Sequence, residues 1–144
     1  MSALDKAALF IVCYTIETDR IDAPAFSLNL TVNPPKETVH GLGKITQSTS
    51  PPLDITTRLD GSFTHMTVMP DNTHILVVAT GYPVIHWPPY SGVGQVIPPN
   101  AELRMLLSRD WKSGTANYKY LDNQGDWHSM SDASVNYANC PVLT

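Results

Sequence analysis

Asp54, His65 and His74 are residues whose types and spacing could support chemistry. A carboxylate and two imidazoles can bind a transition metal or act as general acid and base. Two predicted reversals, a hairpin turn at Asp60-Gly61 and a turn at Pro70-Asp71, bring the three side chains onto one sheet face. The alternative is an ordinary polar patch on a solvated face. A slip of one residue in either register would separate the three side chains.

The two turns also predict how the strands between Leu53 and Thr80 pair. The first turn sets Thr57 against Thr64, and the second sets His65 against Leu76. Alternation then gives a core face made of Leu53, Ile55, Thr57, Met66, Val68, Ile75 and Val77. The opposite, mixed face carries Asp54, Thr56, Arg58, Phe63, His65, Thr67, His74, Leu76 and Val78.

His86, Trp87 and Tyr90 form a second candidate site in an irregular Pro/Gly-rich loop over residues 81–100. Aromatic rings on a proline-stiffened loop offer a preorganised platform for a sugar ring or an apolar ligand. The alternative is that these rings plug a barrel mouth or pack into a subunit contact. The ligand-binding prediction therefore comprises His86, Trp87, Tyr90, Asp54, Arg58, His65 and His74.

Familiar catalytic and metal-binding motifs are absent from the sequence. It has no nucleophile elbow, no P-loop, no dinucleotide fingerprint and no His-Glu-x-x-His motif. We therefore predict no catalytic residue, no metal ligand and no cofactor. The remaining aromatic residues Trp111, Tyr118, Tyr120 and Trp127 are interpreted as packing residues, with Tyr120 paired against Trp127.

Alternating apolar residues predict about eight strands joined by short reversals. Residues 8–17 are apolar on both faces, which predicts that both faces are covered. Residues 26–33 alternate cleanly and have one wet face. In the next strand, Gly41 and Gly43 share a face and allow a backbone or a bulky side chain to come close. We predict an all-β, antiparallel up-and-down meander that closes into a barrel, with a two-sheet β-sandwich as the alternative.

Composition limits the classes of function. The 144 residues suit one domain, spanning 1–144, and charged residues make up only 15% of them, so the surface is unusually neutral. The net charge of -4 and the scattered Lys and Arg residues argue against a nucleic-acid partner. Apolar runs are too short for a membrane-spanning helix. The N-terminus lacks a basic region and a cleavage site, which predicts a cytoplasmic protein.

The two cysteines, Cys13 and Cys140, match no metal-ligand spacing. A disulfide between them stays open at this point. A reducing cytoplasm would favour a buried, apolar Cys13 and a free thiol at Cys140.

Several segments carry a family resemblance, among them Gly41-Leu42-Gly43-Lys44-Ile45-Thr46-Gln47, Met66-Thr67-Val68-Met69-Pro70, Trp87-Pro88-Pro89 and Asp110-Trp111-Lys112-Ser113-Gly114-Thr115. Together they resemble a family of short, mostly bacterial proteins known as a domain of unknown function, family 1842. The likeness spans about residues 8–128. The family carries no known activity, so the resemblance implies a bacterial, single-domain protein and no particular chemistry.

These observations favour a non-enzymatic protein that binds a small ligand or a carbohydrate. A structural, self-assembling interaction protein is the first alternative, and a cofactor-free barrel isomerase or cyclase is the second. Strand residues 9–16 are apolar on both faces, so one set of side chains needs cover from outside the barrel. A homo-oligomer, dimer or larger, is therefore predicted.

Overall fold

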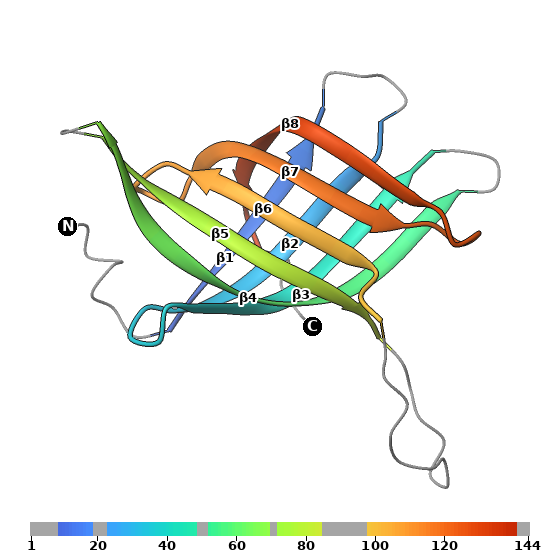
Figure 1. Cartoon of the computed structure of the whole chain (residues 1–144), viewed down its shortest axis with the longest axis horizontal. Coiled ribbons are helices and arrows are strands. Elements are labelled where there is room, and N and C mark those ends of the chain that lie inside the picture. The colour runs from blue at the N-terminus through green and yellow to red at the C-terminus, as the bar shows by residue number, and fades with distance from the viewer. Residues whose placement is uncertain (1–8, 19–22, 49–51, 70–71, 85–97, 141–144) are drawn as a thin grey trace, which may run out of the picture.

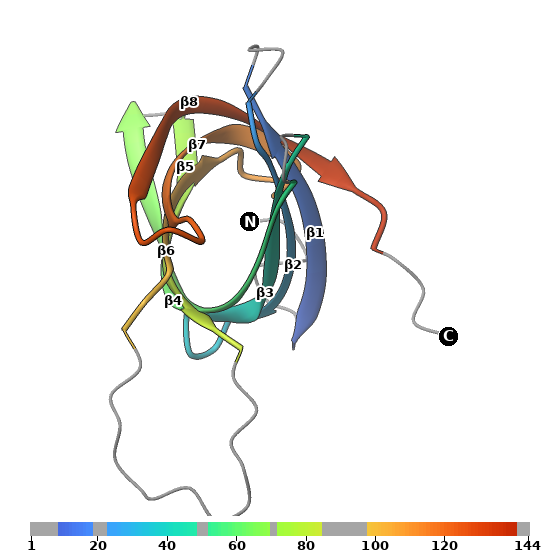
Figure 2. The ribbon, with the colours of Figure 1, turned by 90° about the vertical axis from the view of Figure 1, so that its right-hand side faces the viewer.

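Eight antiparallel strands close into a barrel within the residues that the structure, a computed structural model, describes: 9–18, 23–48, 52–69, 72–84 and 98–140 (Figure 1). Each strand pairs with the next along the chain, and β1 pairs with β8 to complete the ring (Figure 2). The strands are β1 (Phe10–Glu17), β2 (Ala25–Asn33), β3 (Thr38–Gln47), β4 (Leu53–Met69), β5 (Asn72–Pro83), β6 (Ala101–Leu107), β7 (Ser113–Leu121) and β8 (Trp127–Ala138). The predicted up-and-down barrel is confirmed.

Within the described ranges, no helix is long and apolar enough to cross a bilayer.

Aliphatic and aromatic side chains fill the barrel interior, because alternate residues of every strand point inward. Close packing extends to the backbone. A Cβ added at Gly43 would lie 3.2 Å from Leu59 Cδ1 and would press against the Phe26 ring. The predicted close approach at this glycine is thus confirmed. The interior enclosed by the described residues is lined by one continuous cluster of buried apolar side chains.

Trp111 closes the end of the barrel at which β1 begins. Its indole is fully buried and packs edge-on against Phe10 and Phe63, with ring centroids 5.4 Å and 5.1 Å away. The Tyr14 hydroxyl donates a 2.6 Å hydrogen bond to the Trp111 carbonyl, and burial raises the pKa of that hydroxyl. Trp111 has a φ of 66° in the loop between β6 and β7. Packing therefore holds this residue in a conformation that few non-glycine residues adopt.

The hairpin predicted at Asp60-Gly61 is wrong. Strand β4 continues through both residues, and Gly61 pairs with Val39 on one side and Ala79 on the other. A Cβ at Gly61 would clash with the carbonyl oxygen of Val78. This glycine therefore permits a close backbone approach inside a long strand and does not form a turn.

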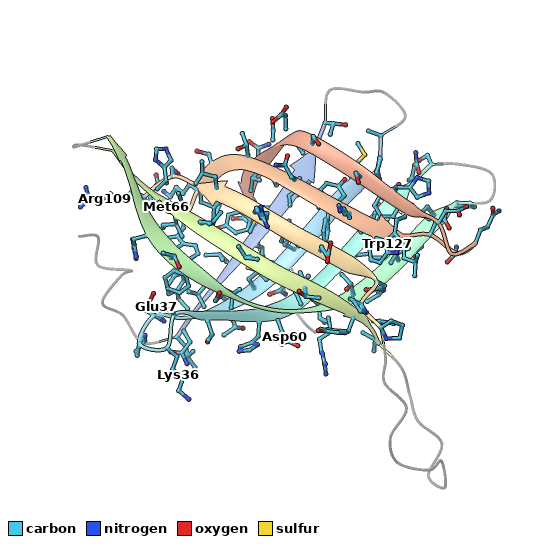
Figure 3. All side chains as sticks on the ribbon, viewed as in Figure 1. Lys36, Glu37, Asp60, Met66, Arg109 and Trp127 are labelled. Carbon is cyan, nitrogen blue, oxygen red and sulfur yellow. A yellow bond between two sulfur atoms is a disulfide. The ribbon has the colours of Figure 1, made fainter. Side chains whose placement is uncertain are left out.

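Strands β4 and β5 pair antiparallel, as predicted, but the predicted register is wrong. Met69 pairs with Asn72, and an irregularity between Thr67 and Met69 sets His65 opposite Ile75 instead of Leu76. A bulge inserts one residue and shifts every later pair by one. As a result Phe63 points into the core and Met66 lies on the outer wall (Figure 3), the reverse of the predicted faces.

Three smaller expectations are also corrected. On the first strand, Leu9 and Ile11 are 62% and 60% exposed, so its outer face is not fully covered by this chain. Strand β5 extends to Pro83, so regular structure reaches into the predicted 81–100 loop. Trp127 pairs with Leu121 rather than with Tyr120, and its side chain is 47% exposed instead of packed.

Candidate ligand-binding groove

The structure does not bring Asp54, His65 and His74 together. Asp54 lies near the start of β4 and points outward, whereas His65 is eleven residues further along and lies near the opposite end of the barrel. At about 3.3 Å per residue, that separation is roughly 36 Å along the strand. His65 packs against the Phe63 ring with centroids 5.9 Å apart, and His74 is opposite Met66. The predicted carboxylate–imidazole constellation is therefore wrong as a single site.

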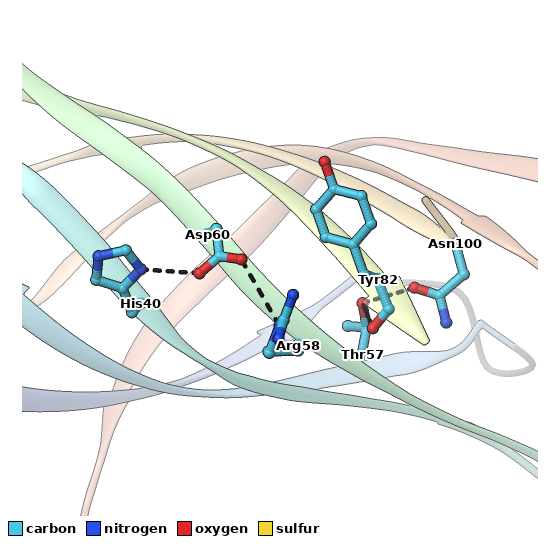
Figure 4. Close-up of polar contacts among 6 residues, drawn as sticks. All are labelled: His40, Thr57, Arg58, Asp60, Tyr82 and Asn100. Carbon is cyan, nitrogen blue, oxygen red and sulfur yellow. Dashed lines mark hydrogen bonds and ion pairs between the residues drawn. The ribbon is translucent and has the colours of Figure 1, made fainter. Parts of the chain in front are cut away.

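Arg58 and Asp60 belong to an exposed charged group on the outer wall of β3 and β4. Arg58 Nε lies 3.7 Å from an Asp60 oxygen, and His40 Nδ1 lies 2.8 Å from the other (Figure 4). All three side chains are exposed, so solvent screens these ion pairs and each contributes little to stability. These three side chains place charged and polar groups on the outer wall of the barrel.

The second predicted site, His86, Trp87 and Tyr90, lies outside the described residues. The structure does describe Asn100, which precedes β6, and shows how its side chain is held in place. The Thr57 hydroxyl, fully buried, donates a 2.6 Å hydrogen bond to the Asn100 side-chain oxygen (Figure 4). The Asn100 amide nitrogen in turn donates to the Thr56 carbonyl at 3.3 Å. A satisfied polar pair inside the barrel thus fixes the start of β6 against β4.

Two grooves of ligand size lie on the outer wall of the barrel. One, which we call the polar groove, crosses β5 to β8, has a volume of about 410 Å³ and is lined by residues that include Thr80, Glu102, Arg104, Asn117, Lys119 and Ser129. The other, which we call the tail groove, has a volume of about 400 Å³ and lies between β1–β4 and the end of β8. Both volumes fall within the range of small-molecule sites, about 300–1,000 Å³.

The tail groove is built from two neighbouring rows of outward-facing residues. Strand pairing places Cys13, Asn29 and Leu42 in the first row and Thr15, Ser27, Lys44 and Thr56 in the second. Paired residues on adjacent strands lie about 5 Å apart, so the rows form one continuous surface. The surface combines an apolar strip with a few hydroxyl, amide and ammonium groups.

A disulfide forms one side of the tail groove. Cys13 is bonded to Cys140, with a Cα–Cα distance of 5.3 Å, and Ala138 and Asn139 form the lip of the groove. Cys13 points outward from β1 yet is only 3% exposed. The expectation of a free thiol at Cys140 is therefore wrong. Two residues separated by 127 positions meet here because β1 and β8 are neighbours in the closed barrel.

Lys44 supplies the positive charge of the tail groove. Its Nζ lies 3.5 Å from Asp54 Oδ2, and both side chains are more than half exposed. Arg58 is directly opposite Leu42 across β3 and β4. Two of the predicted ligand-binding residues, Asp54 and Arg58, thus lie beside this groove, although no local sequence pattern connects them with Lys44 or Leu42.

The polar groove has a different character, since charged and hydroxyl side chains dominate its lining and most of them are exposed. It lies beside an irregularity in the pairing of β7 with β8. There the Asp132 backbone N–H donates a 2.9 Å hydrogen bond to the Asn117 side-chain oxygen, and Asp132 has a φ of 56°. Its lining exposes less apolar surface than that of the tail groove, so it offers a ligand less apolar contact. This groove is the weaker candidate.

Across the part of the chain that the structure describes, no three His, Cys, Asp or Glu residues are grouped so that they could hold an ion. The His128 ring is bonded to Asp122 at 2.7 Å, and this bond is the largest of the effects that lower the pKa of the Asp122 carboxyl. It belongs to the turn between β7 and β8, where Asp122 also accepts bonds from Gln124 and Asp126.

Comparison with known proteins agrees with the resemblance drawn from the sequence. A family model described as a domain of unknown function, DUF1842, matches residues 7–127. Among curated proteins, none matches the chain.

Proposed function

Because the chain belongs to the DUF1842 family of domains of unknown function, we propose a function from its own geometry: reversible, non-enzymatic binding of a small amphipathic ligand in the tail groove. The observation that carries the proposal is the concave space of about 400 Å³ between the disulfide-tethered chain end and the wall of β1–β4. Buried apolar side chains line the barrel interior, whereas the groove lies on the outer wall, where a ligand can reach it from solvent.

The lining indicates the chemistry of the ligand. Leu42 is 52% exposed and lies in the same row as Cys13, so an apolar ligand body would remove this leucine from water. Thr15, Ser27 and Thr56 offer hydroxyl groups along the second row, and Lys44 can pair with an acidic group. The exposed Lys44–Asp54 pair is weak enough for a ligand anion to compete with Asp54. A compact apolar acid fits these features.

Anilinonaphthalene sulfonate tests the proposal, because it joins an apolar ring system to a negative charge. We expect saturable binding to the natural chain with one dye per chain. Leu42→Asp should weaken binding about tenfold or more, since it removes apolar contact and places a negative charge beside the dye. Dye fluorescence titration gives both affinities.

Val78→Asp is the matched control, because Val78 is also an outward-facing, partly exposed strand residue, at 39% exposure, but lines the polar groove. It should leave dye affinity unchanged. An unchanged affinity in Leu42→Asp, or an equal loss in both variants, would contradict the proposal. Loss in Val78→Asp alone would assign binding to the polar groove.

The other predicted activities lack comparable support. Carbohydrate binding depends on His86, Trp87 and Tyr90 and stays a prediction. The barrel isomerase or cyclase required Asp54 or His65 to line an enclosed pocket, but the Asp54 side chain is 59% exposed and is paired with Lys44 on the outer wall. That alternative therefore loses one of the two residues on which it rested.

Self-association is a second proposed function, supported by the exposed side chains of Leu9, directly before β1, and of Ile11, on the outer face of β1. A second copy covering them would remove apolar surface from water. We expect the natural chain to scatter light as a dimer or larger at micromolar concentration and Ile11→Glu to scatter as a monomer. A monomeric mass for the natural chain would end this proposal.

Location inside the cell remains a prediction. The sequence favoured the cytoplasm, whereas the Cys13–Cys140 disulfide is typical of an oxidising compartment. We propose that the disulfide-bonded form is the one that binds ligand. Alkylation of free thiols in freshly lysed cells, followed by mass spectrometry, would show which form the cell contains.

A further inference from the structure

We infer that the tail groove is gated by the redox state of Cys13 and Cys140; this inference rests on the proposed function and names its regulation. The pairing of β1 with β8 begins at Glu17–Ser134 and ends at Cys13–Ala138. Asn139 and Cys140 therefore lie beyond the last strand, and the disulfide is the covalent link that returns them to the wall.

The lip of the groove depends on that link. Ala138 and Asn139 line the groove directly, while Cys13 forms part of its floor and is almost fully buried beneath the tethered chain end. When the bond is broken, Asn139 is released from the wall while Ala138 stays paired with Cys13, so the groove loses the outer part of its lip and becomes a more open sheet surface. A flat, solvated surface binds small molecules poorly because it covers little of the ligand.

The chemistry needs a dithiol reductant, such as a cellular dithiol protein or dithiothreitol. Cys140 is only partly buried, so a thiolate attacks its sulfur, forms a mixed disulfide and expels Cys13 as a thiolate. The second thiol of the reductant then attacks the mixed disulfide and releases the Cys140 thiolate. Two electrons and two protons pass to the protein, and the dithiol becomes a disulfide. A disulfide donor reverses the exchange.

The test compares dye binding by the full-length oxidised chain, the same chain after dithiothreitol, and the Cys140→Ala variant. We expect reduction and Cys140→Ala each to weaken anilinonaphthalene sulfonate binding about tenfold or more. Dithiothreitol should have no further effect on Cys140→Ala, which excludes an action of the reagent elsewhere. Near-ultraviolet circular dichroism of the buried Trp111 reports whether the barrel is still folded.

Hydrogen exchange provides a second measurement on the natural chain. Reduction should increase exchange most at the end of β8 and at the facing part of β1, while amides in β4 and β5 remain the most protected, at the level that the lower global stability sets. Equal dye affinity in both redox states would overturn the gate, and so would global unfolding on reduction, which would make the disulfide a general staple. If oxidised dye binding proves independent of Leu42, the proposed site itself fails, whatever the redox result.

Discussion

Removing the Cys13–Cys140 disulfide is expected to lower the free energy of unfolding by about 5 kcal/mol, because the bond closes a loop spanning almost the whole chain. Without it the denatured chain gains the conformational freedom of that loop. The bond also lies at the end of the β1·β8 ladder that closes the barrel. Urea unfolding of the natural chain and of Cys140→Ala, followed by far-ultraviolet circular dichroism, measures the difference.

Dithiothreitol supplies the internal control. The reduced natural chain should have the stability of Cys140→Ala, since both lack the same crosslink. Cys140 lies outside the strands and is partly exposed, so truncating its side chain costs little by itself. A decrease below about 1 kcal/mol would show that the bond constrains the unfolded chain far less than its loop length implies.

Trp111→Ala is expected to cost about 3–5 kcal/mol, the range for removing a buried tryptophan. The indole closes one end of the barrel against Phe10 and Phe63, so its loss leaves a cavity that both rings line. The Tyr14 hydroxyl keeps its acceptor, because that acceptor is the backbone carbonyl of residue 111. The effect therefore measures ring packing, and thermal or urea unfolding gives its size.

Trp127→Ala is the matched control for this variant. The two residues are of one type, but the Trp127 side chain is 47% exposed whereas that of Trp111 is 1% exposed. We expect Trp127→Ala to change the free energy of unfolding by less than about 1 kcal/mol. Similar losses in both variants would mean that Trp111 does not close the barrel end as the structure indicates.

The sequence could predict the faces of single strands, but pairing between strands was harder to predict. Ile55, Thr57, Ile75 and Val77 were placed in the core and are buried. Two errors in the predicted strand pairing lie between these buried residues. The hairpin predicted at Asp60-Gly61 does not form, and the turn residues do not predict the bulge between Thr67 and Met69. Each error exchanges the two faces, so the second cancels the first. Only the residues between the two errors, such as Phe63 and Met66, were assigned to the wrong side.

The candidate groove could not be predicted from local pattern. Its residues come from four strands and the chain end, and each is ordinary within its own strand: a threonine, a serine or an outward leucine. The pair of cysteines, Cys13 and Cys140, indicates that these two segments could lie side by side. Assuming a reducing compartment favours free cysteines and so hides this indication.

Alternation of apolar residues was enough to predict the strand content and the antiparallel order, because this pattern acts over a few residues. Closure into a barrel instead of a two-sheet sandwich, and the set of residues that share the outer wall, depend on pairing between distant strands. Closure brings the first strand beside the last, so Cys13 reaches Cys140 and the tail groove forms between them. Such contacts depend on the register of every strand in the ring, and a single glycine or bulge is enough to change it.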